Sequence, residues 1–519
     1  MTLLNAVLFL PLIGFILTLF IPKERTGAIR VLALVVSLLT FIASLGLIAP
    51  FWFRSPGAYV FETNVSWIDS PAIRYHIALD GLSLWLIILT TLLTPVCVLI
   101  SWRGIDRRVK EFFAFLLLLE FGLIGVFCSF DLFLFYVFWE ISLVPMYFLI
   151  GIWGHDRRIY AAVKFFLFTM TGSVLMLAAM IYLYTRAGTF DYTTIMSMLQ
   201  TGRLSFSSAE QLPLFLAFFL AFAIKVPIFP LHTWLPDAHG EAPTAGSIML
   251  ASVMLKMGCY GLLRFCVPLF PSAAHECASW INVLAIIGII YGALVAMVQP
   301  NMKRLVAYSS VSHLGFVVLG IFSFTQVGVD GAVYQMLNHG ISTGALFLLV
   351  GLLYERRHSL EISAYGGVST PAPMLAAAFM ITMLASIGLP SLNNFIGEYL
   401  VLQGAALVHF SWAVWAAIGV ILSACYMLWF YQRMFFGKAS DDLTHHMFDL
   451  KPREYFAIVP LIVLMVWMGT FTQSFMPPID ATNARLLQQS VNGIEVHVKR
   501  ETKKPHAVLV ASKESGDAR

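Results

Sequence analysis

Four ionisable side chains interrupt long apolar stretches of this 519-residue chain, namely Glu140, Lys225, Lys256 and Glu398. A charged group at the centre of a membrane helix costs about 2.5–3.5 kcal/mol on insertion scales, so intramembrane ionisable residues usually mark functional sites. Carboxylates and amines in apolar surroundings either bind an ion or exchange a proton with a neighbour. The four residues therefore predict ion handling, with the proton as the favoured ion.

The backbone around Lys225 is expected to be irregular, because Pro227, Pro230 and Pro236 follow it closely. Each proline removes a backbone N–H and clashes with the carbonyl four residues earlier, so a helix here breaks or unwinds. A buried cation beside loosened backbone is typical of an ion-handling site. A second break is predicted at Pro390, shortly before Glu398.

The same charges permit plainer interpretations. Glu140 could belong to a static ion pair, and Glu398 could be a protonated acid that only packs and donates a hydrogen bond. Lys256 is harder to explain in this way, because it lies about 18 Å from either end of its apolar stretch at helical rise. A lysine stem cannot snorkel that far, so its amine needs a partner or water inside the bundle.

Two histidines, His313 and His339, lie in neighbouring apolar stretches between Lys256 and Glu398 in chain order. Imidazole titrates near neutral pH and can relay protons, although a single helix histidine is more often a satisfied hydrogen-bonding group. A relay role is the favoured interpretation. Lys164 lies near a helix end and fits snorkelling as well as function, and Arg264 is expected to be an interfacial anchor.

Metal and cofactor chemistry is not predicted for this chain. His232, Asp237, His239 and Glu241 match no zinc-binding spacing, and a polar funnel at a helix end explains them better. The six cysteines form no CxxC pair. No Gly-rich phosphate loop or haem motif is present, so the energy for ion movement is expected to come from another subunit.

If Glu140 pairs with Lys225, the carboxylate holds the lysine protonated, and separating the two would drive the proton towards Lys256. An external event that opens or closes one ion pair could thus produce directional transfer. The expected site is a Glu-Lys-Lys-Glu proton relay of Glu140, Lys225, Lys256 and Glu398, with His313 and His339 as possible intermediates.

The amino-acid composition indicates the fold class that would hold such a relay. With 59% hydrophobic and only 12% charged residues, the chain is predicted to be an all-α polytopic membrane protein. About fourteen transmembrane helices are predicted, at 2–21, 29–52, 79–101, 112–130, 132–151, 160–184, 213–236, 244–269, 278–298, 303–324, 331–353, 372–409, 411–432 and 456–476.

The seventh and twelfth of these spans share a Pro or Gly break beside one ionisable residue, and they lie five spans apart. Because five is odd, they run in opposite directions, as inverted repeats require. The predicted divisions are 1–110 (helices 1–3), 111–270 (first five-helix repeat, helices 4–8), 271–436 (second, inverted repeat, helices 9–13), 437–480 (a loop and helix 14) and 481–519 (a polar C-terminal tail).

The distribution of basic residues predicts orientation. Lys and Arg crowd the loops after odd-numbered spans, whereas the loops after even-numbered spans hold only Arg54, Arg74, Arg186 and Arg203. The positive-inside rule then places both termini on the outer side of a bacterial plasma (inner) membrane. The net charge of +4 reflects this bias, so the lipid bilayer is an expected partner and nucleic acid is not.

Several segments resemble the antiporter-like subunits of respiratory complex I. They are Phe-Trp-Glu140-Ile-Ser-Leu-Val-Pro-Met-Tyr, the run Lys225-Val-Pro-Ile-Phe-Pro-Leu-His-Thr-Trp-Leu-Pro-Asp-Ala-His, Leu-Lys256-Met-Gly-Cys-Tyr-Gly, Lys303-Arg-Leu-Val-Ala-Tyr-Ser-Ser-Val-Ser-His-Leu-Gly and Asn-Phe-Ile-Gly-Glu398-Tyr. The resemblance covers the chain to about residue 480. Glu398 stands where other members of the family carry lysine, and this glutamate is typical of one branch.

The resemblance implies fourteen helices, an inverted repeat with discontinuous helices 7 and 12, and relay roles for Glu140, Lys225, Lys256 and Glu398. It also implies that NADH, FMN, iron–sulfur clusters and quinone belong to partner subunits, and that neighbouring antiporter-like subunits are partners. The alternatives are a subunit of a multisubunit cation/proton antiporter or membrane-bound hydrogenase, a stand-alone solute symporter, and a scaffold with purely structural charges.

Overall fold

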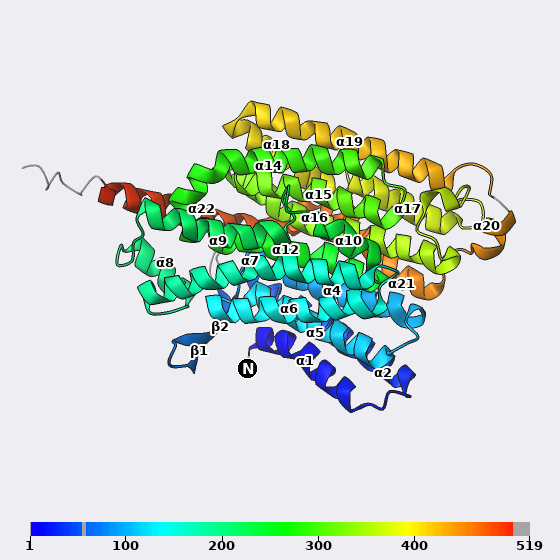
Figure 1. Cartoon of the computed structure of the whole chain (residues 1–519), viewed down its shortest axis with the longest axis horizontal. Coiled ribbons are helices and arrows are strands. Elements are labelled where there is room, and N and C mark those ends of the chain that lie inside the picture. The colour runs from blue at the N-terminus through cyan, green and yellow to red at the C-terminus, as the bar shows by residue number, and fades with distance from the viewer. Residues whose placement is uncertain (1, 54–58, 440, 502–519) are drawn as a thin grey trace, which may run out of the picture.

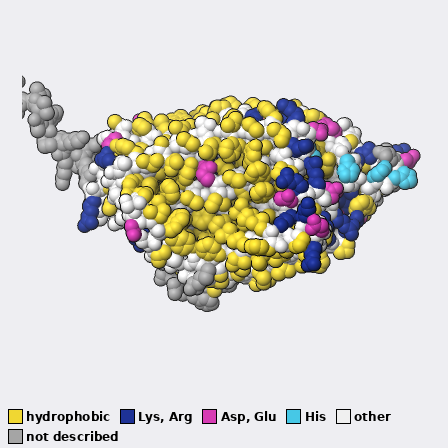
Figure 2. Space-filling model, turned by 60° about the horizontal axis from the view of Figure 1, so that its bottom comes forward, with side chains coloured by type: hydrophobic (Ala, Val, Ile, Leu, Met, Phe, Trp, Pro, Cys, Tyr) yellow, Lys and Arg dark blue, Asp and Glu magenta, His cyan; other side chains and the backbone are white. Residues whose placement is uncertain are grey.

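The computed structural model describes residues 2–53, 59–439 and 441–501. Its helices lie side by side along the longest axis of the molecule (Figure 1). Hydrophobic side chains cover the middle of the visible surface, and Lys and Arg gather at the end that carries helix α20 (Asp441–His446) (Figure 2). Thirteen helices in the described ranges are long and apolar enough to cross a membrane.

The elements of the N-terminal part are α1 (Leu3–Phe20), α2 (Thr26–Leu45), α3 (Ala49–Phe53), β1 (Val60–Ile68), β2 (Ile73–Leu79), α4 (Gly81–Gly104), α5 (Val109–Cys128), α6 (Leu132–Trp153), α7 (Arg158–Ala187) and α8 (Tyr192–Gln200). The central elements are α9 (Ser208–Lys225), α10 (Trp234–Glu241), α11 (Thr244–Met249), η1 (Leu250–Met254), α12 (Leu255–Gly261), η2 (Leu262–Cys266) and α13 (Val267–Leu269). The C-terminal part holds α14 (Pro271–Met297), α15 (Met302–Ile321), α16 (Gln326–Arg357), η3 (Ile362–Ala364), α17 (Pro373–Ser386), α18 (Asn393–Val408), α19 (Phe410–Phe435), α21 (Pro452–Thr470), η4 (Thr472–Ser474) and α22 (Met476–Glu501), besides α20.

The prediction of an all-α polytopic membrane protein is confirmed. The predicted span 372–409 is represented by two shorter helices, α17 and α18, and the other spans by the long helices. Two features lie outside that prediction. The polar stretch after α3 contains an antiparallel hairpin of β1 and β2, and α22 runs through the predicted boundary at residue 480. The inverted five-helix repeats remain a prediction.

Burial separates central from peripheral helices. The most apolar parts of the segment from α11 to α13 and of α16 are entirely buried, whereas only a third of the corresponding parts of α2, α19 and α21 is buried. A helix that is apolar on all sides and buried on all sides belongs in the core of a bundle. Lys256 and His339 lie on these two central segments, so lipid cannot reach them.

Both predicted helix breaks are present. Helix α9 ends at Lys225 and the chain resumes helical structure at Trp234, and α17 ends at Ser386, seven residues before Asn393 opens α18. At the first break, the Trp234 indole N–H donates to the Ile224 carbonyl at 2.9 Å, which satisfies an acceptor that the helix end leaves free. Gly388 adopts a positive φ of 76° in the second break, a conformation that favours glycine.

Arg264 is not the interfacial anchor that its place near a helix end suggested. Its side chain is fully buried, and Nη2 donates to both carboxylate oxygens of Asp80 at 2.6 Å. Arg485 of α22 also donates to Asp80, at 2.7 Å. The sequence did not reveal this ion pair, because Asp80, which caps α4, lies far from Arg264 in the chain. This ion cluster joins α4, η2 and α22.

Candidate relay of buried charges

Among the residues that the structure describes, Lys225 has no polar partner for its amine. It is fully buried, and Nζ makes no hydrogen bond. Instead, Nζ lies 5.5 Å from the ring centre of Trp139 and 5.2 Å from that of Phe165. Aromatic faces attract a cation, but they do not replace its hydrogen bonds to water. The lysine is therefore held in place while its amine is free to take a new partner.

Glu140 follows Trp139 on α6 and supplies the carboxylate that acts on Lys225 through its charge. Its Oε1 is buried without a hydrogen-bond partner. The structure thus brings the two predicted residues into electrostatic range but does not hydrogen-bond the lysine amine to the carboxylate. The predicted pair is open in this state.

Lys256 lies two residues after the end of the π-helical turn η1. Such a turn widens the helix and displaces backbone carbonyls from their usual partners, and π-turns are frequent at functional sites. Here Lys256 Nζ donates to the Ala251 carbonyl at 2.6 Å and contacts His339 Nδ1 at 2.7 Å. Because an ammonium group only donates, Nδ1 of His339 accepts, and the ring proton of a neutral His339 is then on Nε2.

His339 and His313 form the next link. Their ring centres lie 5.8 Å apart, and the Nε2 atom of each ring is buried without a hydrogen-bond partner. On its other side, His313 Nδ1 lies 2.9 Å from Glu398 Oε1. A carboxylate accepts, so Nδ1 of His313 donates and its Nε2 is free to accept a proton. The two tautomers are therefore compatible with transfer from His339 to His313.

Glu398 is held more firmly than Glu140. It is 4% exposed, and Gln335 Nε2 donates to the same Oε1 at 3.1 Å. The break between α17 and α18 makes room for it, because a Cβ on Gly388 would lie 3.0 Å from Oε2. Asn393 fixes the start of α18 by donating from Nδ2 to the Asn338 carbonyl at 3.1 Å.

All six residues expected from the sequence are buried or half-buried within the bundle. Four of them, Lys256, His339, His313 and Glu398, form a continuous series of close neighbours. The other two, Glu140 and Lys225, form a separate pair. Because the Lys225 amine makes no hydrogen bond, the series is interrupted between Lys225 and Lys256.

A second basic cluster, which the sequence analysis missed, lies at the end of the bundle where α15 begins. Lys303 is 1% exposed, and its Nζ donates to the Ala242 carbonyl at 2.6 Å and contacts His155 Nε2 at 3.2 Å. Burial and the charge of Lys303 lower the pKa of His155 to about 4. His155 is therefore neutral at pH 7 and can accept from the lysine. Its place in a basic loop gave no sign of this role.

His239 lies within electrostatic range of both Lys303 and Lys256. It is fully buried, neither ring nitrogen has a hydrogen-bond partner, and its ring stacks on Phe347 at 4.6 Å. The sequence placed His239 in a polar funnel at a helix end, and only the tertiary fold brings it near two lysines.

Glu120 on α5 was also missed. It is fully buried, neither carboxyl oxygen meets hydrogen-bond geometry, and its surroundings include Thr94 and Cys97 of α4. A carboxyl within the apolar stretch 112–130 is the available sequence signal for such a residue. The Asp237 carboxylate, by contrast, forms ion pairs with Lys164 at 2.7 Å and with Arg304 at 3.7 Å. Among the described residues, no group of three His, Cys, Asp or Glu side chains could hold a metal ion.

A bundle of broken membrane helices around a buried line of amine, imidazole and carboxyl groups defines an antiporter-like membrane subunit. Comparison with known proteins gives a narrower assignment. Residues 129–424 match the family model described as NADH:quinone oxidoreductase/Mrp antiporter, TM.

Individual relatives agree with this match. The chain is 44% identical over 91% of its length to NADH-quinone oxidoreductase subunit M of Rickettsia prowazekii, of which 96% is covered. It is 41% identical to NADH-ubiquinone oxidoreductase chain 4 of Arabidopsis thaliana, over 93% of this chain and 97% of that one. A chain of respiratory complex I from Thermus thermophilus with bound NADH superposes with a TM-score of 0.84 at 32% identity, covering 93% of this chain and 99% of that chain. The chain belongs to the complex I antiporter-like subunit family, which confirms the resemblance drawn from the sequence motifs.

Proposed function

We propose that this chain is the M-type (chain 4) proton-translocating subunit in the membrane arm of an NADH-quinone oxidoreductase. The observation that carries the proposal is the series of contacts from Lys256 through His339 and His313 to Glu398 inside an apolar bundle. Such a series can move a proton but contains no oxidant or reductant. NADH, FMN, iron–sulfur clusters and quinone are therefore assigned to partner subunits.

The proposed transfer begins at the open pair. When Glu140 approaches Lys225, the carboxylate stabilises the protonated amine, and when it withdraws, apolar surroundings favour loss of the proton. The proton passes to Lys256 across the interruption between the two lysines, through water or a side-chain rearrangement. Quinone reduction in partner subunits would drive the opening and closing.

The second half of the proposed transfer uses the tautomers of His339 and His313 described above. Lys256 gives a proton to Nδ1 of His339, whose Nε2 proton moves to Nε2 of His313 by ring rotation or through one water molecule. His313 then releases its Nδ1 proton to Glu398. Each step breaks one N–H bond and forms one N–H or O–H bond, so no charge is left behind in the apolar core.

Proton uptake is proposed at the Lys303–His155 cluster, with His239 as the intermediate between it and Lys256. Lys303 contacts His155, whose loop also carries Arg157 and Arg158, so the positive-inside rule supports a cytoplasmic location for this cluster. With the termini on the opposite side, the chain would lie in a bacterial inner membrane beside neighbouring antiporter-like subunits.

A subunit of a multisubunit cation/proton antiporter or a membrane-bound hydrogenase is the second candidate, because the matching family model includes Mrp antiporters. The co-purifying subunits distinguish the two. Peripheral redox subunits that oxidise NADH support the first function, and a set of small membrane proteins without them supports the second. Pumping assays in sodium-free buffer distinguish proton from sodium transport.

The direct test is Lys225→Ala in the intact complex, assayed in inverted membrane vesicles. NADH-driven acidification of the vesicle interior should fall on the order of tenfold, because a proton carrier is lost. Assembly should persist, since no hydrogen bond of the amine is broken. Lys23→Ala, at an exposed lysine, serves as the control. Normal pumping by an assembled Lys225→Ala complex would refute the proton role.

A further inference from the structure

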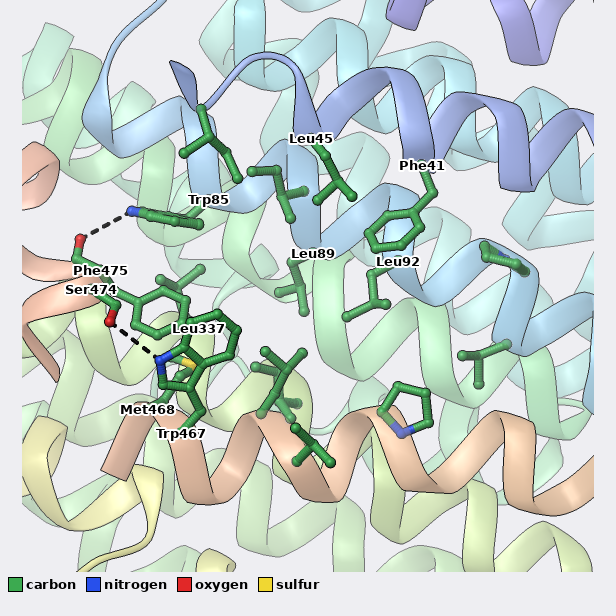
Figure 3. Close-up of a pocket in the computed structure, with 18 of the residues that line it drawn as sticks. Phe41, Leu45, Trp85, Leu89, Leu92, Leu337, Trp467, Met468, Ser474 and Phe475 are labelled. Atoms are coloured by element: carbon green, nitrogen blue, oxygen red, sulfur yellow. Dashed lines mark hydrogen bonds between the residues drawn. The ribbon is translucent and has the colours of Figure 1, made fainter. Parts of the chain in front are cut away.

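A groove of about 530 Å³ runs along α4 between α2 and α21. Figure 3 shows Phe41 and Leu45 of α2 on one side, Trp467 and Met468 of α21 on the other, and Leu92 of α4 in between. The groove belongs to neither the relay nor the uptake cluster. Its size is typical of a ligand site and exceeds that of an ordinary packing defect.

Water is a poor occupant of this groove. A buried water needs two to four polar partners. The polar side chains in the lining are already engaged, because Trp85 Nε1 donates to the Phe475 carbonyl at 3.1 Å and Trp467 Nε1 to Ser474 Oγ at 3.2 Å. The remaining lining is hydrocarbon and aromatic. An apolar molecule is therefore required to fill the space.

The dimensions select the kind of apolar molecule. The lining extends along α4 from Trp85 to Leu99, which is about 21 Å at helical rise. The centre of a water-sized sphere can move through about 530 Å³ over that length, a path about 6 Å across. Adding a water radius of about 1.4 Å on each side places the walls about 8–9 Å apart, whereas a helix with its side chains is about 10–12 Å across. One leaflet of the hydrocarbon core is about 15 Å thick. The groove is thus too narrow for a partner helix but long enough for one lipid acyl chain.

Charge at one end indicates the headgroup. Arg103 lies one helical turn beyond Leu99 on α4, and Arg453 lies one turn before Phe456, which lines the groove on α21. Arg453 Nη1 is buried without a hydrogen-bond partner, although the charge of Glu355 lies nearby. Two guanidinium groups at the same end favour a phosphate, which arginine can bind through two N–H groups at once. At the opposite end, Trp85 and Trp467 are typical of the membrane–water interface.

We propose that this groove is a binding site for one acyl chain of an anionic phospholipid, with the phosphate held at Arg103 and Arg453. The lipid would fill the space between α2 and α21 and so join the peripheral helices to α4. None of the six proposed relay residues lines the groove, so the proposal does not depend on the chain's role in proton transfer.

The test uses the intact complex in membranes doped with phosphatidylglycerol that carries a diazirine in the middle of one acyl chain. After illumination, mass spectrometry of peptides should locate labels between residues 88 and 99 of α4 and between 463 and 468 of α21. An unlabelled groove beside labelled outer helices would overturn the proposal, because a partner subunit would then cover it.

Two variants that fill the groove, Leu92→Trp on α4 and Val463→Trp on α21, should each abolish the label on the other of these two helices. Leu407→Trp adds the same bulk at a 68% exposed position of α18 and should leave labelling unchanged. Unchanged labelling in either assembled groove variant would overturn the acyl-chain site. Arg453→Gln should remove the preference for phosphatidylglycerol over the same probe built on phosphatidylcholine. Equal labelling by the two probes in the wild type would overturn the anionic headgroup.

Discussion

The two ends of the relay hold their charges in opposite ways. At Lys225 the amine faces two aromatic rings and makes no hydrogen bond. At Glu398 one oxygen accepts from both His313 and Gln335. Both sites adjoin a broken helix, so the same backbone device supports a loosely held group in one region and a tightly bonded group in the other.

The difference suggests separate tasks. A buried charge without hydrogen bonds gains much from any approaching partner, so the Glu140–Lys225 region is suited to switching. A hydrogen-bonded series of groups keeps its geometry and its tautomers, so the Lys256–Glu398 region is suited to conduction. The two regions should therefore respond differently to substitutions that preserve shape, and four predictions examine this difference.

Lys256→Met should cause the largest loss. It removes the donor to His339 and to the Ala251 carbonyl while keeping an unbranched side chain that is one atom shorter. NADH-driven pumping in vesicles should fall by on the order of a hundredfold, the usual effect of losing a positioned proton donor. Pumping above a third of wild type in an assembled complex would show that protons bypass the conducting region.

Glu398→Gln should cause the next largest loss, on the order of tenfold in pumping. The amide keeps an oxygen for His313 but has no proton to exchange, so the end of the series is blocked. Gln335→Met is the matched control, because it removes one hydrogen bond to Glu398 and leaves the other. If both variants lost pumping equally, Glu398 would act through its packing rather than through its proton.

Features that depend on neighbouring residues could be predicted from the sequence, and contacts between residues far apart in the chain could not. Apolar span length and proline positions are local, so the membrane class, the break after Lys225 and the break before Glu398 could all be predicted. The central residues were also accessible, since a charge in an apolar run is visible without a partner. The tertiary pairing was not, because His339 and Lys256 lie 83 positions apart.

Most of the failures have the same cause. Arg264 was assigned to the interface because it lies near a helix end. Its partner Asp80 lies 184 positions away, so the sequence did not reveal the ion pair. Lys303 and His155 were not selected as candidates because both occur in basic segments, although the fold buries the lysine and brings the two together. The two strands were missed because they form an irregular hairpin within a polar stretch between predicted membrane helices. The ion pair and the basic cluster need long-range contacts that periodicity does not encode, and the hairpin lacks a regular alternation.

Glu140→Gln and Glu140→Asp test whether the switching region depends on charge. Gln keeps the shape and loses the charge that acts on Lys225, so pumping should fall about tenfold, whereas Asp keeps the charge one bond further away and should lower it about twofold. NADH-driven vesicle acidification and the amount of assembled complex are the measurements. Equal losses in the two variants would indicate a packing role and remove the proposed distinction between the regions.

Glu120→Gln should have the smallest effect and defines the limit of the switching region. Glu120 is a second buried carboxyl on the α5 side, but no hydrogen bond connects it to Glu140 or Lys225. If Glu120 carries no transported proton, the isosteric amide should leave pumping within about twofold of wild type. Glu120→Ala should instead lower the thermal stability of the complex, because it opens a cavity at a cost of about 1–3 kcal/mol. A loss of pumping in Glu120→Gln as large as that in Glu140→Gln would instead extend the switch to α5, because charge and not volume would then be the property that both positions require.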